Sequence, residues 1–394
     1  MAASPDAELR LSHESSRRIT MLRFPLIYGV ILIHAYGLAV KFSHSSISSA
    51  SWPVLLAQTL ISQVLARTAV PLFFLISGML FFLHYDASSA WYRRQLSSRV
   101  GSLLVPYLFW NAAVLLLMCV LQSLPMLSVF FSGRGESVTT FGLFDSLNAL
   151  LGLTHDPIAD HFWFIRDLML LALAVPLVAS ISLRVPRLSL ALYTAIWLAN
   201  KHLRPFGVIS FDAILFFSAG AVISLHRWKP ERLDAYWKPI TVGYLTMALL
   251  DAVILARATP PQGLQSSYDG RFHLLTILLG MAWVWVAAGQ ACRRPWMESL
   301  MAKLAPLSFF VFAAHELLLE GLKKLGYKIL APASFAEAIL VYLAAPGGDG
   351  RHHARGRRRV ANALARRLPC GHGPALRVDP VRRPARPSFS RGIA

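Results

Sequence analysis

The stretch ITMLRFPLIYGVILIHAYGLAV, from Ile19 to Val40, decides the fold. Its 22 residues are mostly apolar, and a helix of this length crosses the ~30 Å hydrocarbon core of a bilayer. Arg23 and His34 lie within it, and at ~100° per residue their spacing puts them within ~20° of the same helix face. An ionisable side chain inside a membrane helix is costly, so both residues are functional candidates.

The composition predicts that nearly the whole chain lies in a membrane. Of its 394 residues, 55% are hydrophobic and only 15% are charged, whereas a soluble domain has about 25% charged residues. The mean hydropathy is +0.51. We therefore predict an all-α, polytopic membrane protein. Its cysteines, Cys119, Cys292 and Cys370, have no metal or redox spacing, so neither a metal site nor a disulfide framework is predicted.

The pattern of apolar segments predicts about ten transmembrane helices. Segment 53–66 is either a short interfacial helix or an extension of the second span. The loop from Ser123 to Asp160 contains GLFDSLNALLGL, which predicts a short amphipathic helix. The tenth span is truncated, since its apolar run stops after about eleven residues. The predicted spans are 19–40, 67–84, 102–122, 162–182, 187–200, 209–226, 237–256, 272–290, 305–322 and the truncated 335–345.

The distribution of basic residues indicates how the chain is oriented in the membrane. The formal net charge is +19, but a large part of it comes from the last fifty or so residues. In the rest of the chain, the N-terminus and the loops after the second, fourth, sixth and eighth spans are richer in arginine and lysine than the loops between them. The lysines after the ninth span are the exception. This alternation predicts a cytoplasmic N-terminus and argues against a nucleic-acid partner.

The chain therefore divides into a cytoplasmic segment 1–18, a transmembrane domain 19–345 and an Arg/Pro-rich tail 346–394. The first segment lacks the apolar core and cleavage site of a signal peptide. The tail contains arginine but no lysine, with abundant proline, glycine and alanine. Two interpretations remain open for it: translation of a shifted reading frame, or a genuine basic tail that contacts anionic lipid.

His34 and Arg23 are the first candidate catalytic residues. An imidazole titrates near neutral pH, so His34 would suit a general base. The alternative is structural: His34 would bond a neighbouring helix, and Arg23 would extend to the lipid phosphates.

A cluster of arginines precedes the third span. Arg93, Arg94 and Arg99 lie in WYRRQLSSRVGSLLVPYLFWN, on the predicted cytoplasmic side. Their forked guanidinium groups suit phosphate recognition, as a nucleotide-bearing donor would require. The alternative is that they serve only to orient the span.

Two later segments supply candidate substrate-binding residues. In HFWFIRDLMLL, Trp163, Arg166 and Asp167 share a helix face and, with His161, could bind a polar acceptor. Arg166 and Asp167 need not pair with each other. In LSFFVFAAHELLLEGL, His315 and Glu316 are ionisable groups within a predicted span. A solvated rim, belt anchoring or a buried structural network would explain these residues equally well. Two further membrane acids, Asp212 and Asp251, have no obvious partner in the sequence.

The order of these motifs resembles the acyltransferase type 3 membrane family over roughly residues 19–345. The resemblance rests on Arg23 and His34, on PLFFLISG, on the arginines before LLVPYLFWN, on WFIRDL and on SFFVFAAHELLL. Members are ten-helix inner-membrane O-acyltransferases that move acetyl or other short acyl groups from cytoplasmic acyl-CoA to surface glycans. The resemblance implies that Arg23 and His34 are essential, that acyl-CoA is a substrate rather than a tightly bound cofactor, and that carbohydrate and membrane lipid are partners.

The resemblance and the residues leave two rival functions. Intramembrane charges also occur in transporters of small polar solutes, although such a protein should show related halves with matching broken helices. The truncated tenth span departs from the family pattern, which leaves an inactive product as the second rival.

Overall fold

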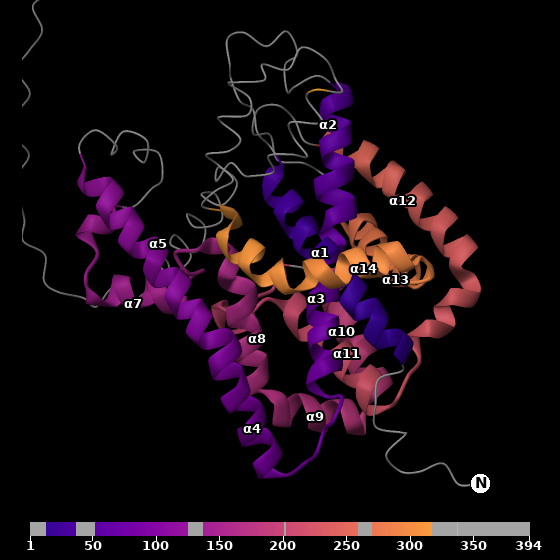
Figure 1. Ribbon diagram of the computed structural model, residues 1–394, viewed down its shortest axis with the longest axis horizontal. Coiled ribbons are helices and arrows are strands. Elements are labelled where there is room, and N and C mark those ends of the chain that lie inside the picture. Colours follow the sequence, from indigo (N-terminus) through magenta and orange to yellow (C-terminus); the bar gives the residue numbers. More distant parts are fainter. Residues whose placement is uncertain are drawn as a thin grey trace, which may run out of the picture. The chain divides into compact units, whose positions relative to one another are not determined.

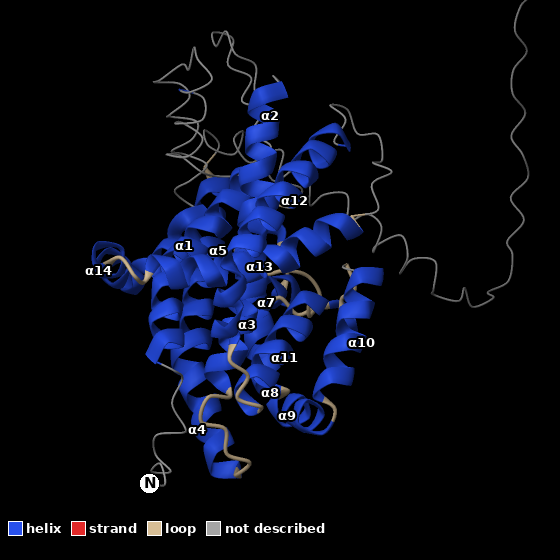
Figure 2. Cartoon of the chain, turned by 90° about the vertical axis from the view of Figure 1, so that its right-hand side faces the viewer, coloured by secondary structure: helices blue, strands red, loops and turns tan. Residues whose placement is uncertain are grey.

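The fold described here is that of a computed structural model, which describes residues 13–36, 52–124, 137–200, 202–258, 270–316 and 337. All of these residues belong to one unit, Met1–Asp349. Nearly all of the predicted tenth span, 335–345, and the whole predicted tail, 346–394, lie outside the described residues. In the part of the chain that is described, every regular element is a helix and no strand occurs (Figure 2).

The helices are labelled in Figure 1, and most of them overlap a predicted span. The first half of the fold comprises α1 (His13–Ala35), α2 (Trp52–Gln58), α3 (Ala69–Phe81), α4 (Ser89–Arg99), α5 (Val105–Ser123) and α7 (Leu143–Leu151). The second half comprises α8 (Trp163–Leu173), α9 (Val175–Arg184), α10 (Pro186–Ala199), α11 (Phe211–Leu225), α12 (Trp237–Ala258), α13 (Arg271–Ala291) and α14 (Pro295–Leu304). Helix α7 is the amphipathic helix that GLFDSLNALLGL predicts.

Short π and 3-10 segments join some helices into longer ones. The π-helices η2 (Thr59–Leu65) and η4 (Val100–Leu104) connect α2 towards α3 and α4 to α5. The 3-10 segments are η3 (Ala66–Thr68), η5 (Val138–Thr140), η6 (Asp160–Phe162), η7 (Pro205–Gly207), η8 (Pro230–Tyr236) and η9 (Ala305–Leu307). Segment 53–66 is thus an extension of the second span, because the helix runs without a break from Trp52 to Phe81.

Five helices in the described part are long and apolar enough to cross a membrane: Trp52–Phe81, Ser89–Ser123, Pro230–Ala258, Arg271–Ala291 and Pro295–Glu316. A sixth is added if α8 and α9 count as one broken span. The prediction of an all-helical, polytopic membrane protein is confirmed. The described residues provide fewer spans than the ten predicted; α11, for example, is apolar but has only 15 residues.

The predicted span 162–182 is not one straight helix. Its two parts, α8 and α9, are bent by 69° at a break near Ala174. Pro176 lies in the first turn of α9. Proline has no backbone N–H and its ring clashes with the preceding turn of a helix, so it ends α8 and begins α9 at a new angle.

Helices α3 and α11 pack against each other in the centre of the fold (Figure 1). Gly78 and Gly220 lie where the two backbones meet. A Cβ atom at Gly78 would overlap the carbonyl oxygen of Phe217, and one at Gly220 would overlap that of Leu75. Small residues at a helix contact allow this close approach. Gly78, within the PLFFLISG motif, is therefore part of the central helix contact.

The start of α1 is held by two ion pairs, one of which involves a buried arginine. Arg18 is completely buried, and its Nη1 donates to Asp234 Oδ1 of η8 at 2.9 Å. Its guanidinium lies 5.6 Å from the ring centroid of Trp285 on α13. Arg17 pairs with Glu298 of α14 at 2.6 Å. A buried charge such as that of Arg18 is stable only when it is paired. Together these contacts fix α1 against three later elements.

Candidate active site

Three histidines from separate parts of the chain converge. His34 lies near the end of α1, His161 lies in η6, and His315 lies in the helix that continues after η9. The ring centroids of His34 and His315 are 5.4 Å apart, and those of His315 and His161 are 4.7 Å apart. We call these three residues the histidine cluster. It contains two predicted site residues, His34 and His315, together with His161.

Glu316 joins the cluster through His161. Its Oε2 lies 2.6 Å from Nδ1 of His161, and the side chains are 42% and 2% exposed, respectively. A carboxylate only accepts hydrogen bonds, so Nδ1 carries the proton and Nε2 is the unprotonated nitrogen of the neutral ring. That Nε2 is buried and has no hydrogen-bond partner among the described residues.

His315 is also left with one unpaired nitrogen. Its Nδ1 lies 2.5 Å from the backbone oxygen of Phe312, which can only accept. Its buried Nε2 finds no hydrogen-bond partner in the described part of the chain. The rings of Phe162 and Phe312 pack around the cluster, with centroids 4.5 Å and 5.2 Å from that of His161. Aromatic side chains therefore flank the cluster that contains these unpaired nitrogens.

Polar side chains of α5 position the segment that leads to His161. Asn111 is completely buried, and its Oδ1 accepts from the backbone N–H of Ala159 at 3.1 Å. The hydroxyl of Tyr107 donates to the carbonyl oxygen of Leu151 at 3.0 Å. Neither residue was predicted as part of a site. Their signal in the sequence is a tyrosine and an asparagine one helical turn apart within an apolar span.

Arg166 and Asp167, which follow His161 in the sequence, hold the segment that leads to His161. They do pair, with 3.1 Å between Arg166 Nη2 and Asp167 Oδ1. Asp167 also accepts from the backbone N–H of Ser210 at 2.8 Å. All the N–H groups of Arg166 are used within the protein, because its remaining acceptors are the carbonyl oxygens of Gly152, His155 and Val208 and the carboxylate of Asp156. Arg166 and Asp167 are therefore held within the protein by their own hydrogen bonds.

Asp156 connects this network to Arg204. Its Oδ1 accepts from Arg204 at 2.8 Å and from Arg166 at 3.2 Å. Burial alone would raise the pKa of this carboxyl, but the hydrogen bonds and positive charges of the two arginines outweigh it and hold the pKa of Asp156 below its usual value. Asp156 is therefore ionised at neutral pH and links the loop after α7 to the segment before α11.

Trp163 lies in the first turn of α8 and packs in the interior. Its ring centroid is 6.1 Å from that of Phe74 on α3. Trp163 follows His161 by two residues in the sequence. Among the ring contacts of the described residues, none joins Trp163 to the histidine cluster.

Arg23 is not brought into the cluster. It is exposed on α1, and ~16 Å of helix axis separates it from His34. Any role of Arg23 toward a substrate at His34 therefore requires a ligand long enough to reach both residues.

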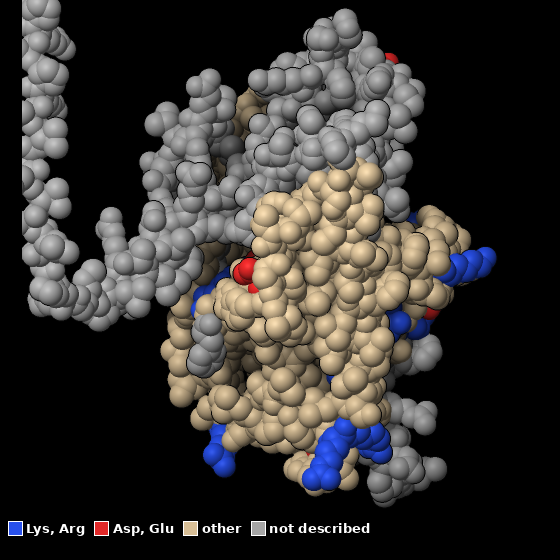
Figure 3. All heavy atoms as spheres, turned by 90° about the vertical axis from the view of Figure 1, so that its left-hand side faces the viewer, with Lys and Arg blue, Asp and Glu red and all other residues tan. Residues whose placement is uncertain are grey.

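The three arginines of α4 differ in their surroundings. Arg93 and Arg94 are exposed, whereas Arg99 is half-buried, with its guanidinium carbon 5.2 Å from the ring centroid of Phe81. Figure 3 shows lysine and arginine side chains along the lower edge of the face that carries α4 and α5, below a largely uncharged middle. The three residues lie on α4 (Ser89–Arg99), and their cytoplasmic position stays a prediction.

The two membrane acids for which the sequence suggests no partner both have one. The indole Nε1 of Trp197 donates to the carboxylate of Asp212. Asp251 is completely buried, and its Oδ2 lies 2.7 Å from Nδ1 of His273 on α13. These pairs tie α10 to α11 and α12 to α13. No group of three or more histidine, cysteine or acidic residues in the described segments has the arrangement of a metal site.

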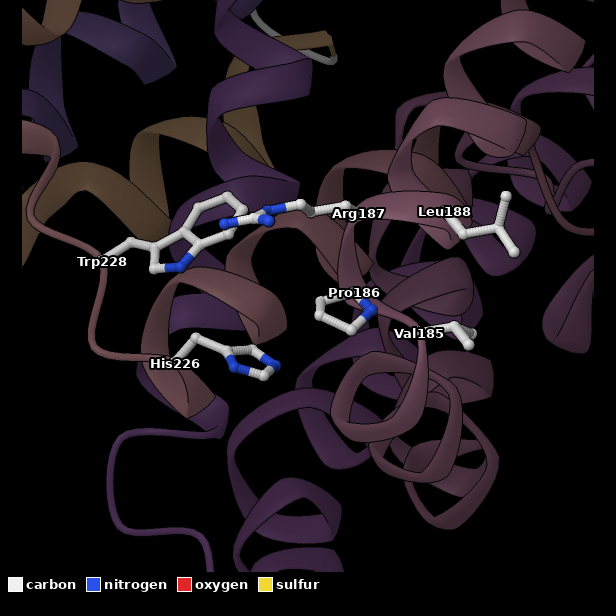
Figure 4. Close-up of a pocket in the computed structure, with 6 residues that line it drawn as sticks. All are labelled: Val185, Pro186, Arg187, Leu188, His226 and Trp228. Atoms are coloured by element: carbon white, nitrogen blue, oxygen red, sulfur yellow. The ribbon is translucent and has the colours of Figure 1, made fainter.

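A shallow cavity of about 330 Å³ lies apart from the cluster, at the turn from α9 to α10 and the end of α11. In Figure 4 the side chain of Arg187 extends toward the ring of Trp228, and His226 lies below them. The imidazole Nε2 of His226 is 2.9 Å from the carbonyl oxygen of Ser182. The cavity contains no residue of the predicted site.

Comparison with known proteins identifies the family. The sequence profile of a family described as an acyltransferase domain matches residues 17–345. The succinoglycan biosynthesis protein ExoH of Rhizobium meliloti (strain 1021) is 29% identical over 314 residues, which cover 76% of this chain and 77% of that protein. No solved structure matches the chain. The match includes every motif on which the predicted resemblance rests, and the chain belongs to the acyltransferase type 3 family of membrane proteins.

Proposed function

We propose that the protein is an integral membrane O-acyltransferase that moves an acetyl or other short acyl group from acyl-CoA to a hydroxyl of a surface polysaccharide or its glycolipid precursor. Membership of the family supports acyl transfer. The relative named for succinoglycan biosynthesis supports a polysaccharide acceptor. The observation that carries the proposal is the convergence of His34 with two further imidazoles in the interior.

His34 is the central residue of the proposed reaction. It accepts the proton of the acceptor hydroxyl while that oxygen attacks the thioester, or it carries the acyl group transiently. Either role requires an imidazole within reach of a substrate in the membrane interior. His34 meets this requirement because it is only half-buried, beside His315.

The donor is proposed to enter from the cytoplasmic side. Arg93, Arg94 and Arg99 would bind the phosphates of the nucleotide, and the pantetheine arm would run into the helical bundle. Arg23 would hold a phosphate or polarise the thioester carbonyl. Acyl-CoA is long, which suits the ~16 Å between Arg23 and His34 along α1.

The acceptor is proposed to bind at the outer side of the same bundle. Trp163, His315 and Glu316 lie around or beside the cluster and are proposed to contact it. Arg166 and Asp167 would contribute by fixing the loop that carries His161, in addition to any direct contact. The protein would act in the bacterial inner membrane with its N-terminus in the cytoplasm.

The decisive experiment measures thiol release from acetyl-CoA by the purified full-length protein in detergent. It is run with and without succinoglycan that has been treated with alkali to remove any ester. We expect acceptor-dependent release by the wild type and by His84→Ala, because His84 is exposed between α3 and α4. We expect a loss of at least about a hundredfold in His34→Ala, the usual contribution of a general base.

The same assay separates the rival functions. A folded His34→Ala protein that transfers acyl groups at the wild-type rate would reject the central role of His34. Movement of polysaccharide fragments across proteoliposomes without thiol release would favour a transporter. Stabilisation by CoA without turnover would favour an inactive product, and restoration of a complete tenth span would then be the next variant.

A further inference from the structure

Within the histidine cluster, His161 has a carboxylate partner. Oε2 of Glu316 is 2.6 Å from its Nδ1, a short and well-placed hydrogen bond. His315 instead donates to a neutral backbone oxygen. The carboxylate fixes the ring orientation and tautomer of His161, and it places a negative charge beside the imidazolium that forms when this ring takes up a proton.

The other nitrogen of His161 is available for chemistry. Nε2 is buried and has no hydrogen-bond partner in the described residues, and the side chain is only 2% exposed. Buried polar atoms are nearly always paired, because an unpaired one costs about 1–3 kcal/mol. The rest of the segment around His161 follows this rule closely, since Asn111, Arg166 and Asp167 satisfy the backbone groups nearby. His161 shares an unpaired Nε2 with its neighbour His315, but of these two imidazoles only that of His161 is held by a carboxylate.

A carboxylate-held imidazole with a free Nε2 is the arrangement that makes a histidine an efficient proton acceptor. We propose that His161 takes the proton of the acceptor hydroxyl and that Glu316 is the positioning residue that holds it. This inference rests on the proposed function and adds to it a residue outside the predicted catalytic pair. It is compatible with direct transfer from CoA and with an acyl group carried transiently by His34.

The proposed step conserves atoms and electrons. The hydroxyl oxygen of the acceptor attacks the acyl carbon, and its proton passes to Nε2 of His161. The bond from the acyl carbon to the leaving atom then breaks, whether that atom is the sulfur of CoA or a nitrogen of His34. The leaving atom receives the proton from His161, and the products are an ester and either CoA thiol or neutral His34.

The test compares His161→Ala with the matched control His84→Ala, which also removes one imidazole. Both full-length proteins are assayed for thiol release from acetyl-CoA with alkali-treated succinoglycan. For His161→Ala we expect kcat to fall by about 10²- to 10⁴-fold, the range for a lost general base. We expect the KM for acetyl-CoA not to rise by more than about threefold, because donor binding is untouched; the KM falls together with kcat if His34 carries the acyl group.

Two further measurements exclude a merely structural role. Imidazole added to the assay should restore part of the kcat of His161→Ala, because it replaces the missing base and repairs no packing defect. Glu316→Gln keeps the size and an acceptor oxygen but removes the charge. It should lower kcat less than His161→Ala, with an unchanged KM for acetyl-CoA and a wild-type melting temperature.

The outcomes separate this inference from the proposed function. If the wild type shows no acceptor-dependent release, the proposed function fails and the role of His161 fails with it. If the wild type is active and His34→Ala is not, but His161→Ala stays within about threefold of wild type, only the role of His161 is wrong. It is equally wrong if His161→Ala loses activity together with thermal stability and imidazole restores none of it.

Discussion

At the scale of single residues, buried polar groups fall into two kinds. The N–H groups of Arg166 are all used by protein acceptors, which makes this residue part of the frame. The imidazoles of His161 and His315 each keep one buried nitrogen without a partner in the described chain. A saturated network rigidifies the structure, whereas an unpaired buried nitrogen costs stability, and at His161 we propose that a substrate uses it.

The stability of the network that Asp156 forms with Arg166 and Arg204 should depend on pH. Its folded-state pKa is lowered, so its contribution is complete above the unfolded pKa of about 3.9 and is lost as the pH falls through the folded value. We expect the melting temperature of the wild type in detergent to fall on acidification below about pH 4. Asp156→Asn should melt lower than the wild type at pH 7 and show a smaller loss between pH 5 and pH 3. A variant with the wild-type melting curve at both pH values would show that this carboxylate contributes nothing.

At the scale of elements, the fold depends on where helices break and where they touch. The proline near the start of α9 separates two helices that the hydropathy alone joins into one span. The bend separates α8, which follows the segment of His161, from α9. At the contact of α3 with α11, glycines bring the backbones close enough that no side chain fits between them.

One methyl group added at the α3–α11 contact should therefore lower the stability of the protein. Gly78→Ala forces the new Cβ into the carbonyl of Phe217, so the helices must separate and lose contacts along their length. We expect a loss of about 1–3 kcal/mol, measured as a lower melting temperature in detergent. Gly101→Ala is the matched control, because nothing lies within 4 Å of a Cβ at that position. It should be neutral or stabilising by up to about 1 kcal/mol. Equal melting temperatures for the two variants would contradict the close contact.

At the scale of the whole molecule, charge and apolar surface describe a membrane protein. Large apolar side chains are exposed along α5 and α12, including Phe109 at 64% and Val242 at 67%. Such surface is unusual in water and expected against lipid. The basic side chains in Figure 3 gather at the end where α4 and α9 lie in Figure 1. By the positive-inside rule, this end is expected to face the cytoplasm.

Single cysteines test that orientation. In a background without the native cysteines, Ala87→Cys between α3 and α4 should react with a membrane-impermeant maleimide only after the cells are opened. Thr154→Cys after α7 should react in intact spheroplasts. Both positions are exposed. Because they fall on opposite sides of the predicted membrane, the reverse labelling pattern would invert the topology, and labelling from the same side would reject the predicted spans.

The sequence by itself determined the fold class, the family and most of the helices. These properties depend on hydropathy over 15 to 20 residues and on the order of short motifs, which are local along the chain. His34, His315 and the WFIRDL segment could be selected as candidates for the same reason: an ionisable group in an apolar run is visible without any neighbour.

Only the tertiary structure decided which of these residues meet. His34, His161 and His315 come together because three distant segments pack side by side, and no spacing within the sequence encodes that contact. The pairing of Glu316 with His161 and the use of every Arg166 donor likewise follow from loop placement. A hydrogen bond depends on the distance and direction between two groups, and those are fixed only when the helices have packed.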